Sequence, residues 1–278
     1  MQIASLIGDP VDHSLSPYMH NAAFRHLGID ATYELWPTPL EHVPARIATL
    51  RNEGYLGANV TVPHKQAVIP MIDEISETAM RIGAVNTLIP TEGGLRGDNT
   101  DAYGFGRSLA DVAGATGVRS AVVVGAGGAS RAVLVSLQDA DCGQIVLVNR
   151  TAAKAEALAS ALATPGVPAI QVVPWEDLAR SVASSDLLVN ATSIGWHGDE
   201  LPFDGGMVEK LPDGAIVFDL TYRSTALLRL GEARGLRTVD GLPMLIHQGA
   251  RAFELWTGQP APVAVMTQSV RDEQARRA

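Results

Sequence analysis

The feature that most constrains the fold is a buried-strand pattern that runs directly into a glycine-rich turn and then into a helix, VVVGAGGASRA at residues 122–132. Gly125, Gly127 and Gly128 allow a tight turn and let backbone N–H groups approach a pyrophosphate at the helix N-terminus, where the helix dipole favours anions. Ser130 stands where the usual fingerprint has its third glycine. A glycine-rich turn alone is weak evidence, since many strand-to-helix turns use glycine only for backbone reasons. Together with the strand pattern before it and the helix pattern after it, the turn predicts a Rossmann-type dinucleotide-binding unit.

The strand that follows indicates which dinucleotide is bound. Sites for NAD carry an Asp or Glu about 20 residues after the first glycine, where it binds the ribose 2′-hydroxyl. Here the strand QIVLVNRT ends in Asn149, 24 positions after Gly125, and in Arg150. A guanidinium can form two parallel hydrogen bonds to a 2′-phosphate and stack on adenine. Thr151 and Lys154 add a hydroxyl and a second positive charge. The sequence therefore predicts NADP as the cofactor, with a solvated surface role for Arg150 as the alternative.

Short β-rich runs alternate with helix-period segments, which is the βαβ rhythm of a mostly parallel sheet. The glycine-rich zone EGGLRGDNTDAYGFG at residues 92–106 interrupts this rhythm, and a second series of strands follows it. Two amphipathic helix patterns close the chain. The second series has five expected strands and no sixth strand for these helices to cover, so we expect them to pack on the first domain. The 278 residues exceed the roughly 100–200 of one domain.

These observations predict a two-domain α/β protein. A discontinuous α/β substrate-binding domain comprises residues 1–101 and 242–278, and an inserted Rossmann-type NADP-binding domain comprises residues 102–241. The active site is expected in the cleft between them.

Composition and charge limit the classes of molecule that this chain can bind. The formal net charge of −9 and a pI near 5.2 argue against nucleic acid or an anionic membrane surface as the main partner. The single cysteine, Cys142, excludes an intramolecular disulfide, and the first residues lack the basic and apolar regions of a secretion signal. No stretch approaches the roughly 20 apolar residues of a membrane span. We therefore expect a cytoplasmic protein.

The polar segment NVTVPHK is a second candidate site. Strand periodicity places Asn59 and Thr61 on one face and Val60 and Val62 on the other, so that the polar pair lines a surface while the valines pack. Lys65 follows at the carboxyl end of this strand, where α/β sheets bind ligands. An exposed lysine and a turn asparagine are the structural alternative.

Eight motifs, in order along the chain, resemble the shikimate dehydrogenase family. The family's SxSP stands as SLSP at residues 14–17, NVTxPxK at 59–65, GAVNT at 83–87, and GxNTD as GDNTD at 97–101. The GAGGAxRA turn, the NRT cofactor motif, NATS at 190–193, and GLxMLxxQ with FExWTG, here GLPMLIHQGARAFELWTG, complete the series. The resemblance runs from residue 3 to about residue 270. It is highly specific, because ordered agreement of this many motifs does not arise by chance.

The resemblance implies an oxidoreductase that uses NADPH to reduce 3-dehydroshikimate reversibly to shikimate, a step of aromatic amino acid biosynthesis. Hydride transfer to the ring carbonyl carbon leaves an alkoxide that needs a proton. Lys65 matches the family's lysine, which donates that proton and takes it back in the oxidation direction. Asp101 matches its paired aspartate, which would hold the ammonium and contact a ring hydroxyl. From the residues alone, Thr100 or Asp101 could instead cap the following helix, and both roles can coexist.

The resemblance also implies a substrate site of short hydrogen-bonding groups, suited to a small carboxylate with several hydroxyls. Ser14 and Ser16 match the family's carboxylate-binding serines, with Tyr222 as a third hydroxyl. Contacts to the ring hydroxyls are matched by Asn59, Thr61, Lys65, Asn86, Asp101 and Gln248. Structural alternatives are a helix N-cap for Ser16 before Pro17, a strand-end amide for Asn86 and a polar helix position for Gln248.

For the cofactor, the resemblance implies contributions from the glycine turn, the end of the next strand and three later segments. The matching residues are Gly125, Ala126, Gly127, Gly128, Ala129, Ser130, Asn149, Arg150, Thr151, Lys154, Thr192, Ser193, Leu220, Gly241 and Met244. No metal site is assigned, because the histidines near the motifs lack metal-ligand spacing and are expected to pack or line the rim, namely His13, His20, His64 and His247.

Two segments depart from the family pattern. Tyr222 is followed by RSTALLRL, which lacks the family's proline and is shorter, and Trp196 stands where methionine is usual. Both segments are expected on the cofactor side of the site, so they bear on how the nicotinamide is seated.

Other functions stay open beside this one. A quinate/shikimate dehydrogenase relative tends to use NAD, with an acidic residue in place of Asn149 and another residue in place of Ser16, so both positions speak against it. Asn149 and Ser16 do not distinguish a shikimate dehydrogenase from a relative that uses an aminoshikimate. A non-catalytic sensor of dinucleotide or shikimate has no need of a proton donor, and Lys65 with Asp101 argues against it. The oligomeric state, monomer or homodimer, is also open.

Overall fold

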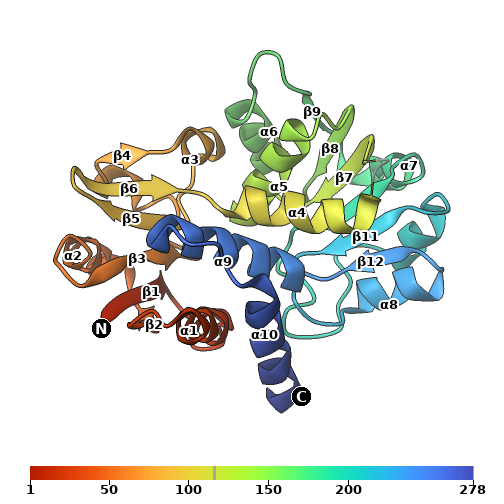
Figure 1. Cartoon of the computed structure of the whole chain (residues 1–278). Helices are drawn as coiled ribbons and strands as arrows, with labels where there is room; N and C mark the ends of the chain where they lie inside the picture. The colour runs from red at the N-terminus through yellow and green to blue at the C-terminus, as the bar shows by residue number, and fades with distance from the viewer. Residues whose placement is uncertain (115–116, 278) are drawn as a thin grey trace. The chain divides into compact units, whose positions relative to one another are not determined.

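The computed structural model describes residues 1–114 and 117–277, and the chain divides into two compact units (Figure 1). Unit 1 comprises Met1–Gly104 together with the residues from Leu245 onward, and unit 2 comprises Phe105–Met244. Unit 1 is therefore discontinuous in sequence and unit 2 is inserted into it. The predicted domain ranges change three residues earlier at each junction, and positions 115–116 and 278 of those ranges lie outside the described residues.

The described part of unit 1 contains a six-stranded sheet in the order β2-β1-β3-β5-β6-β4. Its strands are β1 (Gln2–Gly8), β2 (Ala31–Pro37), β3 (Tyr55–Val60), β4 (Glu74–Ile75), β5 (Thr87–Thr91) and β6 (Gly94–Asp98). Its helices are α1 (Ser16–Leu27), α2 (Val43–Thr49), α3 (Glu77–Ile82) and α10 (Val263–Arg277), with 3₁₀ turns at Leu40–His42 and Ile69–Met71. Two further helices, α4 (Asp101–Ala113) and α9 (Leu242–Thr257), begin or end at the junctions between the units.

The sheet of unit 1 is mixed, because β1 pairs in parallel with β2 and β3 whereas β5 is antiparallel to both β3 and β6. The glycine-rich zone at residues 92–106 was expected to interrupt the strands, and this expectation is wrong for Gly94–Asp98, which form β6. Gly94 has a φ of +129°, a conformation that glycine adopts at little cost, so the turn from β5 into β6 is compatible with a hairpin.

The two valines of the NVTVPHK segment differ in burial. Val60 is buried in a cluster with Ile7, Leu88 and Leu95, as its strand pattern predicts. Val62 is 66% exposed, which corrects the expectation that it packs beside Val60. The strand ends at Val60, so the alternation of inward and outward side chains no longer applies two residues later.

The described part of unit 2 contains a six-stranded parallel sheet in the order β12-β11-β10-β7-β8-β9. Its strands are β7 (Ser120–Val124), β8 (Gln144–Val148), β9 (Ile170–Val172), β10 (Leu187–Asn190), β11 (Ile216–Asp219) and β12 (Arg237–Val239). Its helices are α5 (Gly128–Asp139), α6 (Ala152–Ala161), α7 (Leu178–Val182) and α8 (Ala226–Ala233), with 3₁₀ turns at Trp175–Asp177 and Gly205–Lys210. Sequence patterns missed β9, because it is a three-residue strand at the sheet edge.

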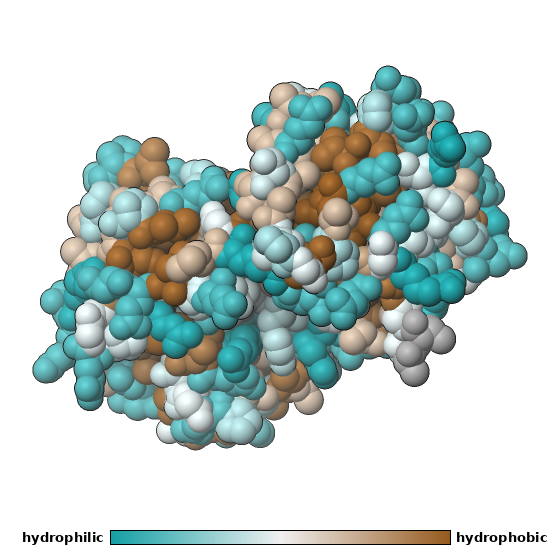
Figure 2. Space-filling view, turned by 90° about the horizontal axis from the view of Figure 1, so that it is seen from above, coloured by the Kyte–Doolittle hydropathy of each residue, from teal (hydrophilic) through white to brown (hydrophobic). Residues whose placement is uncertain are grey.

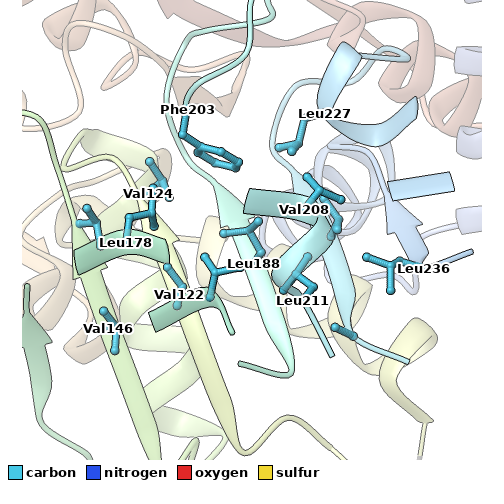
Figure 3. Close-up of a cluster of buried hydrophobic side chains, with 14 of the residues drawn as sticks. Val122, Val124, Val146, Leu178, Leu188, Phe203, Val208, Leu211, Leu227 and Leu236 are labelled. Carbon is cyan, nitrogen blue, oxygen red and sulfur yellow. The ribbon is translucent and has the colours of Figure 1, made fainter. Parts of the chain in front are cut away.

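This strand order is the doubly wound Rossmann arrangement, in which the order reverses between the first and fourth strands of the unit, here β7 and β10. All residues of β10 and β11 are buried, as expected for parallel strands covered on both faces. Figure 3 shows part of the core, where Val122, Leu188 and Phe203 pack with side chains of several elements. Full burial of one such side chain contributes about 1.5–3 kcal/mol to folding.

The two closing helix patterns form α9 and α10, and residues from Leu245 onward belong to unit 1. There α10 packs against α1, and Ser269 Oγ donates a hydrogen bond to the Tyr18 carbonyl at 3.0 Å. The expectation that the end of the chain packs on the first unit is therefore met by these contacts.

The face of the molecule seen in Figure 2 is largely hydrophilic, with apolar side chains in scattered patches. Exposed large apolar residues among the described positions are Met1, Leu40, Val62, Met80 and Tyr103. None of the described helices is both long and apolar enough to cross a bilayer.

Candidate active site

Lys65 and Asp101 form an ion pair in unit 1. Lys65 follows the carboxyl end of β3, and Asp101 is the first residue of α4. The Nζ atom of Lys65 lies 2.5 Å from Oδ2 of Asp101, and the two side chains are only 20% and 10% exposed. Solvent therefore screens this pair less than it screens surface pairs. The carboxylate fixes the ammonium at a defined position, as a proton donor requires.

The second carboxylate oxygen of Asp101 is also used. Asn86 Nδ2 donates to Asp101 Oδ1 at 2.8 Å, so the carboxylate is held from both sides. At the start of α4, Asn99 Oδ1 accepts the Asp101 N–H at 3.0 Å, and Asn99 Nδ2 donates to the Ala84 carbonyl at 2.9 Å. Asn99 thus serves the helix end, while the Asp101 side chain faces Lys65 and Asn86. Asn99 lies inside the GDNTD motif, but its role depends on contacts that the motif does not show.

Asn59 and Asn86 belong to one buried hydrogen-bond network. Asn59 Nδ2 donates to the Asn86 carbonyl at 3.2 Å and to Thr87 Oγ1 at 3.3 Å. Thr87 Oγ1 donates to Asn86 Oδ1 at 2.8 Å, and this oxygen also accepts the Thr100 N–H at 2.8 Å. Asn86 is therefore more than a strand-end amide, because its side chain joins β5, α4 and the residues that lead into each.

Gln248 reaches the same network from α9. Thr100 Oγ1 lies 3.5 Å from Gln248 Oε1, although 148 positions separate the two residues. Gln248 is 9% exposed, and its Nε2 donates to the Leu245 carbonyl at 2.8 Å. It is thus a buried polar group rather than a solvated helix position.

The two serines lie at the N-terminus of α1. The helix begins at Ser16 with Leu15 in the N-cap position, so the N-cap role considered for Ser16 is wrong. Ser14 Oγ instead accepts the Ser16 N–H at 3.2 Å. Ser16 is buried, with 5% of its surface exposed.

Thr61 lies one residue past β3, and its N–H donates to the Ile7 carbonyl at 2.8 Å. A Cβ on Gly8 would lie too close to the Thr61 methyl group, so glycine lets the two chain segments approach each other. All the predicted substrate residues except Tyr222 therefore belong to unit 1, and contacts join Asn59, Asn86, Lys65, Asp101 and Gln248 into one group.

The glycine turn of unit 2 has the geometry that its sequence predicts. Gly125 has a φ of +112°, and a Cβ there would lie 2.9 Å from Thr192 Cγ2. Gly127 and Gly128 open α5, and a Cβ on either would meet no atom within 4 Å. The Gly127 N–H donates to Ser130 Oγ at 3.1 Å, which gives the serine in the third fingerprint position a capping role. The open space above the turn fits a pyrophosphate at the helix N-terminus.

The end of β8 lies beside this turn. Val124 of β7 pairs with Val148 of β8, and the Gly125 N–H donates to the Val148 carbonyl at 2.8 Å. Asn149 Nδ2 donates to the Thr151 carbonyl at 2.9 Å, which shapes the turn into α6. Arg150, Thr151 and Lys154 are exposed at this edge. These residues therefore fit a ribose 2′-phosphate adjoining a pyrophosphate on the glycine turn.

A second buried network fixes the ends of β10 and β11. Asn190 Nδ2 donates to Asp219 Oδ1 at 3.1 Å, and Thr192 Oγ1 donates to Asn190 Oδ1 at 2.7 Å. Asp219 Oδ2 accepts from Thr225 Oγ1 at 2.8 Å. The strand ends that carry Thr192, Ser193 and Leu220 are thereby held together. Asn190 and Asp219 were not among the predicted site residues. Asn190 begins the NATS motif, and Asp219 begins the segment DLTY at residues 219–222, which ends in Tyr222.

Gly241 closes against the same region, and its N–H donates to the Thr221 carbonyl at 3.1 Å. A Cβ on Gly241 would lie 2.0 Å from the Leu220 carbonyl oxygen, so only glycine fits. Met244, three residues later, is buried in α9.

The two departures from the family pattern contact each other in unit 2. The rings of Trp196 and Tyr222 lie 4.7 Å apart at 86°, an edge-to-face arrangement. Arg223 Nη1 donates to the Trp196 carbonyl at 3.1 Å. The tryptophan and the altered segment after Tyr222 therefore form one local structure, which positions the Tyr222 ring.

Two of the four histidines near the motifs are fully buried. His64 Nε2 lies 2.6 Å from the Thr38 carbonyl oxygen. His20 stacks on Tyr33 with 4.4 Å between ring centroids, and neither of its ring nitrogens has a hydrogen-bond partner. Burial lowers the pKa of His20 to about 3, so its imidazole is neutral at physiological pH.

Comparisons with known proteins agree with this geometry. Three family models match: "Shikimate dehydrogenase substrate binding domain" over residues 6–88, "Shikimate / quinate 5-dehydrogenase" over 109–221 and "Shikimate 5'-dehydrogenase C-terminal domain" over 241–271. A shikimate dehydrogenase (NADP(+)) from Synechocystis is 42% identical over 97% of this chain and 94% of its own length.

Solved structures are similar over almost the whole chain. The shikimate 5-dehydrogenase of Thermus thermophilus, in complex with NADP(H) and shikimate, has a TM-score of 0.87 and 40% identity, covering 98% of this chain and 99% of its own. The quinate dehydrogenase of Corynebacterium glutamicum, in complex with NAD, has a TM-score of 0.90 and 32% identity, covering 98% of this chain and 99% of its own. With sequence identity of this extent over nearly its full length, and with matching models for both units, the chain belongs to the shikimate dehydrogenase family.

Proposed function

We propose that this chain is an NADP-dependent shikimate dehydrogenase, which reversibly reduces 3-dehydroshikimate to shikimate in aromatic amino acid biosynthesis. The observation that carries the proposal is the shielded Lys65–Asp101 pair, because a positioned ammonium can protonate the oxygen at which the reduction leaves a negative charge. The names of the relatives, shikimate dehydrogenase (NADP(+)), support both the activity and the cofactor.

Lys65 donates a proton from Nζ during reduction and accepts it back during oxidation. Asp101 orients the ammonium through Oδ2, and Asn86 holds the carboxylate through Oδ1. NADPH, when bound, supplies the hydride.

The substrate-binding domain spans residues 1–101 and 242–278, and the NADP-binding domain spans residues 102–241. Ser14 and Ser16 bind the substrate carboxylate as neutral donors, and Tyr222 adds a third hydroxyl. The ring hydroxyls contact the network described above and the nearby Thr61, in all Asn59, Thr61, Lys65, Asn86, Asp101 and Gln248. Short polar groups suit a ligand that carries several hydroxyls, because each hydroxyl can be paired with a donor or acceptor.

On the cofactor side, Gly127 and Gly128 accommodate the pyrophosphate at the start of α5, and Arg150 binds the 2′-phosphate. Asn149 carries no charge, so it does not repel that phosphate as an aspartate would. The remaining contacts come from the other residues of the glycine turn, from Thr151 and Lys154, and from Thr192, Ser193, Leu220, Gly241 and Met244. A cytoplasmic location and a monomeric or homodimeric state stay predictions.

Initial rates with shikimate and with quinate, each measured with NADP and with NAD, test the proposal. We expect shikimate with NADP to give the highest kcat/KM, at least about tenfold above shikimate with NAD, since charge-assisted bonds to a phosphate contribute about 1.5–3 kcal/mol each. A preference for quinate with NAD would identify a quinate dehydrogenase relative. Binding of dinucleotide and shikimate without turnover would identify a sensor. If the same rates are also measured with an aminoshikimate, turnover of that compound alone would identify an aminoshikimate-using relative.

A further inference from the structure

A buried phenol contacts one of the predicted substrate residues. Tyr33, on β2, is 3% exposed, and its hydroxyl donates to Asn59 Oδ1 at 2.8 Å. Asn59 is assigned to a ring hydroxyl of the substrate, so the phenol holds a residue that is proposed to bind the substrate directly. No sequence motif includes Tyr33.

The bonds around Tyr33 run in one direction toward the catalytic pair. With the phenol donating to Asn59 Oδ1, the Asn59 amide nitrogen donates to Thr87 Oγ1 at 3.3 Å. From Thr87 the series continues to Asn86 and then to Asp101, with distances of 2.8 Å for both bonds. Asp101 finally accepts from Lys65. Each hydroxyl or amide in the series donates to the next group, so the position of the phenol fixes the orientation of the Asn59 amide.

Tyr33 itself is held rigidly. Its N–H donates to Asn21 Oδ1 at 2.8 Å, and its carbonyl accepts from Asn21 Nδ2 at 3.1 Å, so one side chain of α1 binds both main-chain groups. Its ring stacks on His20 and lies 6.2 Å from the ring of Trp256. Trp256 Nε1 in turn donates to the Leu88 carbonyl at 3.0 Å. The phenol oxygen therefore has little freedom to move when its partners do.

We propose that Tyr33 is a positioning residue of the substrate site, which sets the orientation of Asn59 through its single hydroxyl. Because the inference concerns contacts to shikimate, it rests on the proposed function. Asn59 Oδ1 accepts from the phenol, so a ring hydroxyl that binds Asn59 shares this amide with Tyr33. Binding of shikimate therefore changes the hydrogen bonding of Tyr33 although Tyr33 does not touch the substrate.

The first test is Tyr33→Phe, which removes the hydroxyl and keeps the ring that stacks on His20. Asn59 Oδ1 then loses its buried donor. We expect the KM and the calorimetric Kd for shikimate to rise about 5- to 30-fold, with kcat and the KM for NADP changed less than about threefold. Tyr55→Phe is the matched control, because Tyr55 lies in the same unit and packs edge-on against Trp36, outside the network. It is expected to leave all these constants unchanged.

A double-mutant cycle distinguishes positioning from general loosening of the unit. If Tyr33 acts through Asn59, Tyr33→Phe changes the shikimate KM less in an Asn59→Ala background than in the unmutated chain. The same fold-change in both backgrounds, or an unchanged shikimate KM in a folded Tyr33→Phe protein, would overturn the inference. A fall in kcat with no change in KM would overturn it as well.

A second measurement does not depend on how well that variant folds. With 3-fluorotyrosine at residue 33 of the full chain, saturating shikimate is expected to shift the fluorine resonance, whereas the same probe at residue 55 is expected to stay in place. A resonance at residue 33 that shikimate does not move contradicts the inference. Failure of the proposed function has a different signature, because the unmutated chain would then neither oxidise nor bind shikimate.

Discussion

The buried His20 side chain predicts a specific loss of stability in acid. Its ring is fully buried among Tyr33, Trp256 and Phe24, and both nitrogens lack hydrogen-bond partners. Burial lowers the pKa of His20 from 6.5 to about 3. Between these two values the unfolded chain binds a proton at this position and the folded chain does not, so stability falls as the pH falls.

The size of the effect follows from the two pKa values. Each pH unit between them costs about 1.4 kcal/mol, so His20 removes about 2 kcal/mol of folding free energy between pH 7.5 and pH 5. This contribution is fully present above the pKa of the unfolded chain, and it is lost progressively from about pH 6.5 downward. Carboxylates and other histidines add their own dependence, so the contribution of His20 has to be isolated by a variant.

His20→Phe provides that variant, because phenylalanine retains a ring against Tyr33 and does not titrate. Urea unfolding followed by circular dichroism at pH 7.5 and pH 5 gives the free energy of unfolding of each protein. We expect the unmutated chain to lose about 2 kcal/mol more than His20→Phe between these pH values, whereas His197→Gln, which alters an exposed histidine, behaves like the unmutated chain. An equal loss in the unmutated chain and in His20→Phe would show that His20 is protonated inside the fold, and would refute the reasoning.

Three substitutions test the assigned site residues. Lys65→Ala is expected to lower kcat by roughly 10²–10⁴ while the shikimate Kd changes only a few-fold, because a proton donor is lost; initial rates and calorimetry check this, and a kcat near that of the unmutated chain would exclude the role. Ser16→Ala is expected to raise the shikimate KM by about 5- to 100-fold with little change in Tm, since Leu15 and not Ser16 is the N-cap of α1; an unchanged KM would remove Ser16 from the site. Arg150→Ala is expected to weaken NADP by about tenfold or more and to spare NAD, because the 2′-phosphate loses its cation; kcat/KM for both cofactors decides, with Arg180→Ala as the exposed control, and an undiminished preference for NADP would show that another group binds the phosphate.

Local patterns were sufficient wherever backbone geometry determines the structure. The glycines of the turn at residues 125–128 have the conformation and the open space that a dinucleotide site needs, and the buried runs of β10 and β11 identify a parallel sheet. These features can be predicted from the sequence because a positive φ favours glycine and burial on both faces of a strand favours apolar residues. Even there, short strands such as β9 escaped, because three residues carry too little periodicity.

The partners of the polar side chains were decided only by the tertiary structure. The motifs identify Lys65, Asp101 and Asn86 as a set, but the bond from Tyr33 to Asn59 joins residues 26 positions apart, and the contact of Thr100 with Gln248 spans 148. The serine that precedes Pro17 looked like a helix cap, yet Leu15 is the N-cap of α1, and Ser14 Oγ accepts the Ser16 N–H. A hydrogen bond depends on where two groups meet after folding, and sequence patterns determine each group's chemistry but not its neighbour. The sequence by itself therefore determined the family, the α/β fold class and the residue types of the site, whereas packing between distant segments decided which groups orient them.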